Sequence, residues 1–316
     1  MMCSKGIHSL IILAAIFCVQ SALAQQQAAK PEEKKPAPKT PHEMREEDKA
    51  HRDTVVPHLP AGVSRFLDVP YIQDGGEEHQ IDIYVPSGTG PFPLVLMIHG
   101  GGWDAGDKAT AGIDMAMKIT PAGIAVASVN YRFLREAPFP AQIEDCLTAL
   151  NWLRDHAAQY KINPDKIGVV GHSAGGHLTA LLTTVAGTPA FGACSSACKP
   201  VQAAVVISGV TDLRKEAGWP HGPFVFGKVY DSDTALLASP VHYVHAGLPP
   251  FLIIHGSKDS LVPVNQANLF TEALKKAGTE VTLRIVPDRD HDVMRYEGFD
   301  GIKKFFERTL KSQEKQ

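Results

Sequence analysis

The chain has 316 residues, of which 44% are hydrophobic and 21% are charged, so it can bury a full core as one large domain or two small ones. Its 31 lysines and arginines face 34 acidic residues, and the net charge of −3 lacks the basic excess that nucleic-acid binding requires. We therefore expect no nucleic-acid partner. Five cysteines are too few for a disulfide scaffold at this length.

Residues 1–24 have the three regions of a secretory signal peptide. Lys5 precedes an apolar stretch from Leu10 to Val19, and small residues lead up to the expected cleavage site after Ala24. The apolar stretch is shorter than the roughly 18 residues that a membrane span needs, so no stable membrane insertion is expected after cleavage. Lipidation of Cys18 is the less favoured alternative, because the residues before it are not small. We predict an exported protein, periplasmic or secreted, with a mature net charge of −4.

Residues 25–56 are rich in Gln, Pro, Lys and Glu and contain almost no large apolar side chain. Such a composition cannot bury enough surface to offset the entropy of ordering, so we predict a disordered linker with at most a transient helix from Glu43 to Ala50. Residues 57–316 show no repeat and no further change of composition, which indicates a single domain.

Short apolar runs alternate with helical patterns through this domain. Strands are predicted at residues 65–72, 80–85, 94–98, 125–129, 166–170, 203–207, 251–254 and 281–286. The first two form a hairpin, and crossovers that contain helices join the rest. The predicted fold class is α/β, with an eight-stranded, mostly parallel sheet and helices on both faces. In such sheets the chemistry lies at the carboxyl ends of the strands.

A glycine-rich loop, His99 to Trp103 (HGGGW), follows the third predicted strand. Glycines let backbone N–H groups approach an oxyanion, so Gly101 and Gly102 are predicted oxyanion-hole donors, with the N–H of Ala174 as another. A phosphate-binding loop is the competing interpretation, but no P-loop and no GxGxxG motif accompanies these glycines.

The segment Gly171 to Gly175 (GHSAG) lies between the fifth predicted strand and a helical run. A strand, tight turn and helix around GxSxG are typical of a nucleophile elbow, which presents a strained serine at the sheet edge. Ser173 is therefore the predicted nucleophile. His172 and His177 flank the serine and are expected to pack or bond locally.

An acid and a histidine follow the last two predicted strands, in the order that this arrangement requires. Asp259 comes just after the seventh strand and His291 just after the eighth, so both side chains are expected at the sheet edge that carries the nucleophile. His255 begins a turn and is expected to be structural. Asp288 and Asp290 are alternative acids, but they lie too near the histidine in sequence to orient its ring easily.

Residues 208–250 are the only insertion large enough to roof this edge. They are polar and broken by Gly and Pro, so they form no long amphipathic lid of the kind a lipase uses. We expect a short cap and a shallow acyl pocket, with Trp103, Trp219 and Phe224 as lining residues.

The positions of the cysteines and histidines predict the state of the thiols and whether a metal is bound. Cys194 and Cys198 lie four apart in a small-residue loop and are candidates for a local disulfide, while Cys146 is predicted to be a buried free thiol. The histidines show no metal-ligand spacing beyond a weak pair at His242 and His245, so we expect no metal and no cofactor.

Together the motifs resemble the carboxylesterase branch of the α/β-hydrolases that includes the hormone-sensitive-lipase-like, feruloyl-esterase-like and kynurenine-formamidase-like enzymes. The resemblance rests on His99 to Trp103, on the elbow and on Pro249 to Pro263, and it extends over nearly the whole domain. It implies a cofactor-free serine hydrolase with the nucleophile, acid and base named above. The chain departs from these families beside the histidine, where Asp290 and Asp292 stand in place of a nearby glycine.

The leading hypothesis is an exported esterase that removes short or compact aromatic acyl groups from a small-molecule or oligosaccharide ester. Two alternatives stay open. An arylformamidase or amide hydrolase shares both motifs, although its substrate is made inside cells. A non-catalytic binding module would have no need of a complete triad. The oligomeric state is not readable from the sequence.

Overall fold

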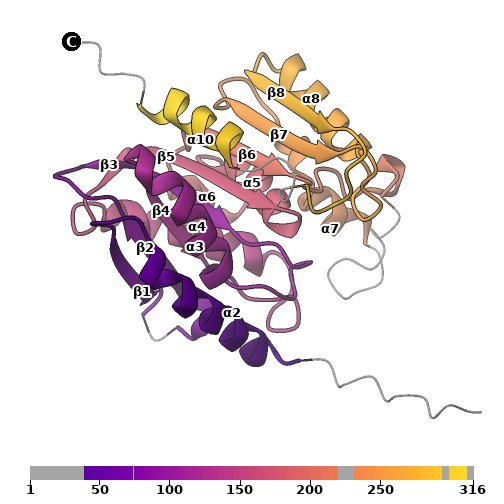
Figure 1. Ribbon diagram of the computed structural model, residues 1–316. Coiled ribbons are helices and arrows are strands. Elements are labelled where there is room, and N and C mark those ends of the chain that lie inside the picture. The colour runs from indigo at the N-terminus through magenta and orange to yellow at the C-terminus, as the bar shows by residue number, and fades with distance from the viewer. Residues whose placement is uncertain (1–38, 74, 220–230, 294–298, 312–316) are drawn as a thin grey trace, which may run out of the picture. The chain divides into compact units, whose positions relative to one another are not determined.

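The computed structural model describes residues 39–73, 75–219, 231–293 and 299–311. Its centre is one sheet of eight strands in the order β1-β2-β4-β3-β5-β6-β7-β8 (Figure 1). The strands are β1 (Ser64–Pro70), β2 (Gln80–Val85), β3 (Phe92–Ile98), β4 (Ala125–Val129), β5 (Ile162–His172), β6 (Ala203–Ile207), β7 (Phe251–Gly256) and β8 (Val281–Val286).

The strand directions match the predicted hairpin followed by crossovers. β2 runs antiparallel to both of its neighbours, β1 and β4, while β4, β3, β5, β6, β7 and β8 are mutually parallel. The predicted eight-stranded, mostly parallel sheet is confirmed. All six parallel strands therefore end at one edge, where the motif residues gather.

Helices cover both faces of the sheet (Figure 1). One face packs against α4 (Ala141–Asp155), α5 (Ala174–Val185) and α8 (Asn265–Lys276), and the other against α3 (Lys108–Ile119) and α10 (Asp300–Phe306). Side chains alternate between these layers along a strand. In β3, Leu96 and Ile98 join the α4 side of the core, whereas Val95 and Met97 join the α3 side. Within the described residues, no helix is long and apolar enough to cross a membrane.

Helix α2 (Pro41–Val55) corrects the prediction of a disordered linker over residues 25–56. The helix begins with a capping box, in which the N–H of Glu43 donates to Oγ1 of Thr40 and the N–H of Thr40 donates to Oε2 of Glu43. It packs against α3 and belongs to the unit of the chain that begins at Thr40. The signal peptide and the rest of the linker, residues 1–38, lie outside the described residues.

Buried ion pairs explain why this polar segment folds. The guanidinium of Arg52 is 5% exposed and donates to Asp68 at 2.9 Å and to Asp82 at 3.0 Å. Lys108, at the start of α3, is fully buried and pairs with the same two carboxylates. Because two cations neutralise two carboxylates, charge pairing holds α2 in place where a large apolar face would otherwise be needed.

All three cysteines in the described part of the chain are free thiols. The candidate disulfide between Cys194 and Cys198 is therefore not formed in this structure. The Sγ atom of Cys198 accepts a hydrogen bond from Arg154 at 3.5 Å, and that of Cys194 lies 3.7 Å from the hydroxyl of Thr148. Cys146 is buried on α4, as predicted.

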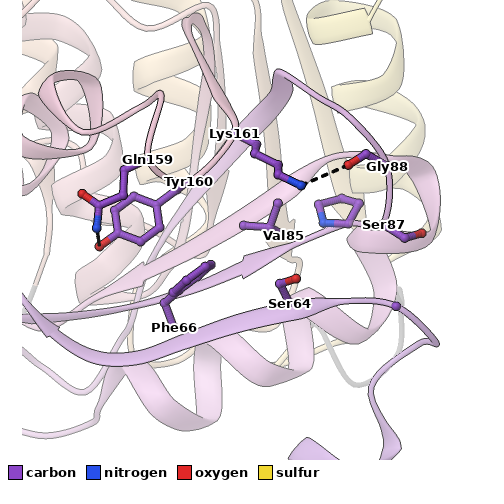
Figure 2. A pocket seen from close by; sticks show the side chains of 10 residues that line it. Ser64, Phe66, Val85, Ser87, Gly88, Gln159, Tyr160 and Lys161 are labelled. Carbon is purple, nitrogen blue, oxygen red and sulfur yellow. Dashed lines mark hydrogen bonds between the residues drawn. The ribbon is translucent and has the colours of Figure 1, made fainter.

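A small pocket lies at the amino-terminal ends of the parallel strands. Its volume is about 240 Å³, and the rings of Phe66 and Tyr160 stand edge to face on one side of it at 4.9 Å (Figure 2). On another side the ammonium of Lys161 donates to the carbonyl of Gly88 at 3.4 Å. This pocket is at the end of the sheet opposite to the glycine-rich loop and the elbow, so it is not the candidate active site.

Candidate active site

The turn between β5 and α5 places Ser173 at the edge of the sheet. Ser173 has a φ of +57° and a ψ of −119°, a strained conformation for a residue with a side chain. The start of α5 lies very close to the end of the neighbouring strand β3. A Cβ atom at Gly175 would collide with the carbonyl oxygen of Ile98 on β3, which explains why the motif needs glycine at this position.

Ser173, His291 and Asp259 form one unbroken line of hydrogen bonds. Oγ of Ser173 lies 2.8 Å from Nε2 of His291, and Nδ1 of the same ring lies 2.8 Å from Oδ2 of Asp259. An ionised carboxylate only accepts, so the proton sits on Nδ1 and leaves Nε2 free to accept from the serine hydroxyl. The structure thus brings together the three residues predicted as nucleophile, base and acid. In the described part of the chain, Asp288 and Asp290 make no hydrogen bond to the imidazole.

The carboxylate of Asp259 is buried and held by four donors. Oδ1 accepts the backbone N–H of Leu261 at 3.0 Å and of Val262 at 2.8 Å, while Oδ2 accepts from His291 and also lies 3.2 Å from Nε2 of His255. Burial alone would raise the pKa of Asp259, but the hydrogen bonds from the two histidines and from Val262 outweigh it and hold that pKa well below its usual range. The acid is therefore ionised at neutral pH.

Two further side chains form hydrogen bonds to the backbone of His291. Its carbonyl oxygen accepts from Nε2 of His172 at 3.0 Å and from the hydroxyl of Ser208 at 3.1 Å. His172 was expected to bond locally, but its partner is 119 residues away. Burial lowers the pKa of His172, which keeps a second positive charge away from the neighbouring imidazole 4.9 Å distant. Neither contact has a signal in the local sequence.

The glycine-rich loop lies beside the elbow. Gly101 has a φ of +112°, and a Cβ atom there would collide with the carbonyl oxygen of Ala105, so the loop can close only with glycine. Within the described residues, no hydrogen bond occupies the backbone N–H of Gly101 or Gly102. The N–H of Ala174, in the first turn of α5, has no acceptor inside the helix either. These are the three donors predicted for an oxyanion hole, and all three residues line the pocket that contains Ser173.

That pocket has a volume of about 390 Å³ and mostly apolar walls. Trp103, Trp219, Val210 and Leu261 surround the serine, so two of the three predicted aromatic lining residues are where they were expected. Phe224 lies outside the described residues. In the described part of the 208–250 insertion the helices are short, the longest being α7 (Ser232–Leu237).

Hydrogen bonds fix both tryptophans. The indole N–H of Trp219 donates to the carbonyl of Leu261 at 2.9 Å, and that of Trp103 donates to Nδ1 of His177 at 3.1 Å. The two indole rings meet edge to face with centroids 6.2 Å apart. They form a rigid aromatic wall on one side of the pocket.

The described residues contain one group with metal-ligand geometry, and it lies away from the pocket. His42 and Glu46, both on α2, lie close to Glu77 at the surface. Lys49 already pairs with both glutamates, at 3.0 Å and 2.7 Å, which neutralises much of their charge. His242 and His245 form no such group in this part of the chain.

Comparison with known proteins places the chain in a family. A family model described as BD-FAE matches residues 81–274. Esterase LipQ of Mycobacterium tuberculosis is 34% identical over 253 residues, which are 75% of this chain and 60% of LipQ. The probable carboxylic ester hydrolase LipM of the same organism is 32% identical over 227 residues, which are 67% of this chain and 52% of LipM. The chain thus spans little more than half the length of these curated relatives.

Solved structures give the same result. A truncated form of a carbohydrate esterase from gut microbiota superposes with a TM-score of 0.71 at 29% identity, covering 80% of this chain and 99% of that one. Esterase 2 of Thermogutta terrifontis with butyrate bound has a TM-score of 0.61 at 25% identity, covering 79% and 91%. Because the matching family model spans more than half of a chain that also has this fold and site geometry, the protein belongs to the BD-FAE family of α/β-hydrolases.

Proposed function

We propose that the protein is an exported serine hydrolase that cleaves carboxylic esters through an acyl-enzyme intermediate. The observation that carries this proposal is the line of hydrogen bonds from Ser173 through His291 to Asp259, at 2.8 Å each, beside three unoccupied backbone donors. A nucleophile, a base held by an acid, and oxyanion donors are the groups that acyl transfer needs.

Each step follows from these groups. His291 takes the hydroxyl proton of Ser173 at Nε2 as Oγ attacks the acyl carbon, and Asp259 stabilises the imidazolium that forms. The carbonyl oxygen becomes an oxyanion and accepts from Gly101, Gly102 and Ala174. When the tetrahedral intermediate collapses, the C–O bond to the alcohol breaks and Nε2 returns the proton to the alcohol. Water, deprotonated by the same nitrogen, then attacks the acyl-enzyme and releases the acid and the free serine.

The substrate that we propose has a short or compact aromatic acyl group on a small alcohol or an oligosaccharide. The pocket volume of about 390 Å³ suits a small acyl group, and the aromatic wall limits its length. The names of two similar structures point the same way, since one is a carbohydrate esterase and another is an esterase with butyrate bound. An exported location, periplasmic or secreted, gives access to esters of extracellular carbohydrate.

Labelling with a fluorophosphonate tests the enzymatic mechanism directly. The wild-type protein is expected to incorporate one phosphonyl group at Ser173, and Ser173→Ala is expected to incorporate none. Ser87→Ala, an exposed serine far from the site, is the matched control and keeps full labelling. A wild-type protein that is folded but not labelled contradicts the proposal and favours a binding module. Faster turnover of a formanilide than of the matching phenyl ester identifies an amide hydrolase instead.

A further inference from the structure

His255 is fully buried beside the catalytic acid, although the sequence assigned it only to a turn. It is the last residue but one of β7, where it pairs with Ile285 of β8. Its Nε2 lies 2.8 Å from the carbonyl oxygen of Val262 and 3.2 Å from Oδ2 of Asp259. The imidazole therefore touches both the loop that carries the acid and the acid itself.

The partners of the ring determine where its proton sits. A carbonyl oxygen and a carboxylate oxygen both only accept, so Nε2 carries the proton; it donates to Val262 at 2.8 Å, with Oδ2 of Asp259 3.2 Å away. Nδ1 is buried and has no hydrogen-bond partner among the described residues. The acceptors at Val262 and Asp259 therefore fix an N–H group at Nε2.

The two histidines share one carboxylate oxygen. Oδ2 of Asp259 faces Nδ1 of His291 at 2.8 Å and Nε2 of His255 at 3.2 Å, while Oδ1 is occupied by two backbone N–H groups. Without the second histidine, Oδ2 would have one partner, the imidazole of His291. With it, the carboxylate is held from both sides, and its plane cannot turn away when the imidazole becomes charged.

His255 cannot replace the base itself. It does not line the pocket with Ser173, and its side chain has no exposed surface. Its loop nevertheless controls where the base lies, because a Cβ atom at the next residue, Gly256, would collide with the carbonyl oxygen of Asp290. The segment before His291 thus packs directly on the backbone that follows His255.

We propose that His255 is a positioning residue for the proposed reaction, whose Nε2–H holds Oδ2 of Asp259 in line with Nδ1 of His291. This inference rests on the proposed serine mechanism. It assigns His255 a role in turnover beyond the packing of a buried residue near the end of β7. It also predicts which chemical feature of the side chain matters: the donor at the position of Nε2, and not the ring.

Two nearly isosteric substitutions separate that donor from packing. In His255→Gln the amide nitrogen takes the place of Nε2 and still donates, whereas in His255→Met the side chain has a similar length and no donor. Turnover is measured per active site, with a fluorophosphonate titration giving the fraction of competent enzyme. We expect His255→Met to lower kcat by about 10- to 100-fold with little change in KM, and His255→Gln to retain most of the activity.

A spectroscopic measurement does not depend on substrate. The proton between Nδ1 of His291 and Asp259 is expected to give a far-downfield ¹H resonance in protein labelled with ¹⁵N-histidine. This resonance should be lost or moved upfield in His255→Met and preserved in His255→Gln. If His255→Met does not fold, His255→Asn takes its place, because the shorter amide cannot reach Oδ2.

The results separate the possible failures. Equal impairment of the Gln and Met variants, or a kcat per active site within about twofold of wild type in the Met variant, overturns the positioning role. Equal loss of melting temperature in both variants with unchanged kcat shows a purely structural histidine and also overturns it. Failure of the serine mechanism itself appears in the wild-type protein, which would then neither label nor turn over.

Discussion

Trp103 donates its indole N–H to Nδ1 of His177, and Nε2 of the same imidazole donates to the carbonyl of Ala238 at 2.7 Å. Because an indole N–H can only donate, Nδ1 carries no proton and the ring is neutral. One uncharged histidine therefore connects the glycine-rich loop after β3, the first turn of α5 and the cap insertion. These are the segments that supply the proposed oxyanion donors and the roof of the pocket.

This arrangement predicts a loss of stability in mild acid. Burial lowers the pKa of His177 to about 4, from 6.5 in an unfolded chain. Between these two pH values the unfolded state therefore binds a proton at this histidine and the folded state does not. Stability should fall by about 1.4 kcal/mol per pH unit for this histidine as the pH is lowered from about 6.5 to about 4. Urea unfolding at pH 7 and pH 5 measures the difference.

The matched variants are His177→Gln, which removes the titrating group, and His245→Gln, which removes an exposed one. His177→Gln should reduce the difference in unfolding free energy between pH 7 and pH 5 by about 2 kcal/mol. His245→Gln should leave it unchanged. His99 is buried in the same way, with a pKa lowered to about 4, so part of the acid sensitivity remains in either variant. An unaltered pH dependence in His177→Gln would show that this histidine titrates normally.

Removing the nucleophile or the base should abolish turnover without unfolding the protein. Ser173→Ala and His291→Ala are each expected to lower kcat on p-nitrophenyl acetate by about 10⁴- to 10⁶-fold. The double variant should be no worse than either single one, because the two residues act as a unit. Circular dichroism verifies the fold. Retention of more than a few per cent of activity in clean Ser173→Ala protein would require a different nucleophile.

The aromatic wall predicts how the acyl preference can be changed. Trp219 is held by the carbonyl of Leu261 and meets the ring of Trp103, so Trp219→Ala removes half of the wall and leaves the sequence of the glycine-rich loop unchanged. We expect the preference in a series of p-nitrophenyl esters to shift from acetate and butyrate toward octanoate. Trp219→Phe should shift it less. Wild-type protein that prefers laurate, or a Trp219→Ala profile identical to that of wild type, would place the acyl group elsewhere.

Breaking the ion pairs under α2 should destabilise the whole domain. Arg52→Met leaves the side chain length similar but removes the cation between Asp68 and Asp82, and a broken buried pair costs about 3 kcal/mol or more. Arg65→Met, at an exposed position on β1, is the control and should change stability by less than about 0.5 kcal/mol. Urea unfolding followed by tryptophan fluorescence compares them. Equal stabilities would mean that α2 contributes nothing to the fold.

The sheet was predictable because its strands are short, apolar and β-branched. Seven of the eight predicted ranges agree with the structure to within two residues at each end, and β5 starts earlier, at Ile162, where it pairs with Phe92 of β3. The proposed triad was predictable for a related reason. The elbow motif names the serine, and the strand order then requires the acid and the histidine to follow the last two strands.

Long-range polar contacts were not predictable from patterns along the chain. Helix α2 has a sequence signal in its capping box, Thr40 with Glu43, but the charges that hold it pair with β1, β2 and α3. The bond from His172 to the carbonyl of His291 joins positions 119 residues apart. The contact between His255 and Oδ2 of Asp259 could not be predicted either, because composition and spacing do not specify which carboxylate oxygen a second histidine contacts.

The ion pairs of α2 also determine where a shortened version of the protein should begin. Arg52 completes a neutral set with Lys108, Asp68 and Asp82, and Lys108 comes just after the glycine-rich loop. A version trimmed to residue 57, where composition alone would place the domain boundary, keeps two carboxylates against a single cation. Fusion proteins, display formats and crystallisation variants should therefore begin at or before Thr40, and a tag is best joined ahead of that residue.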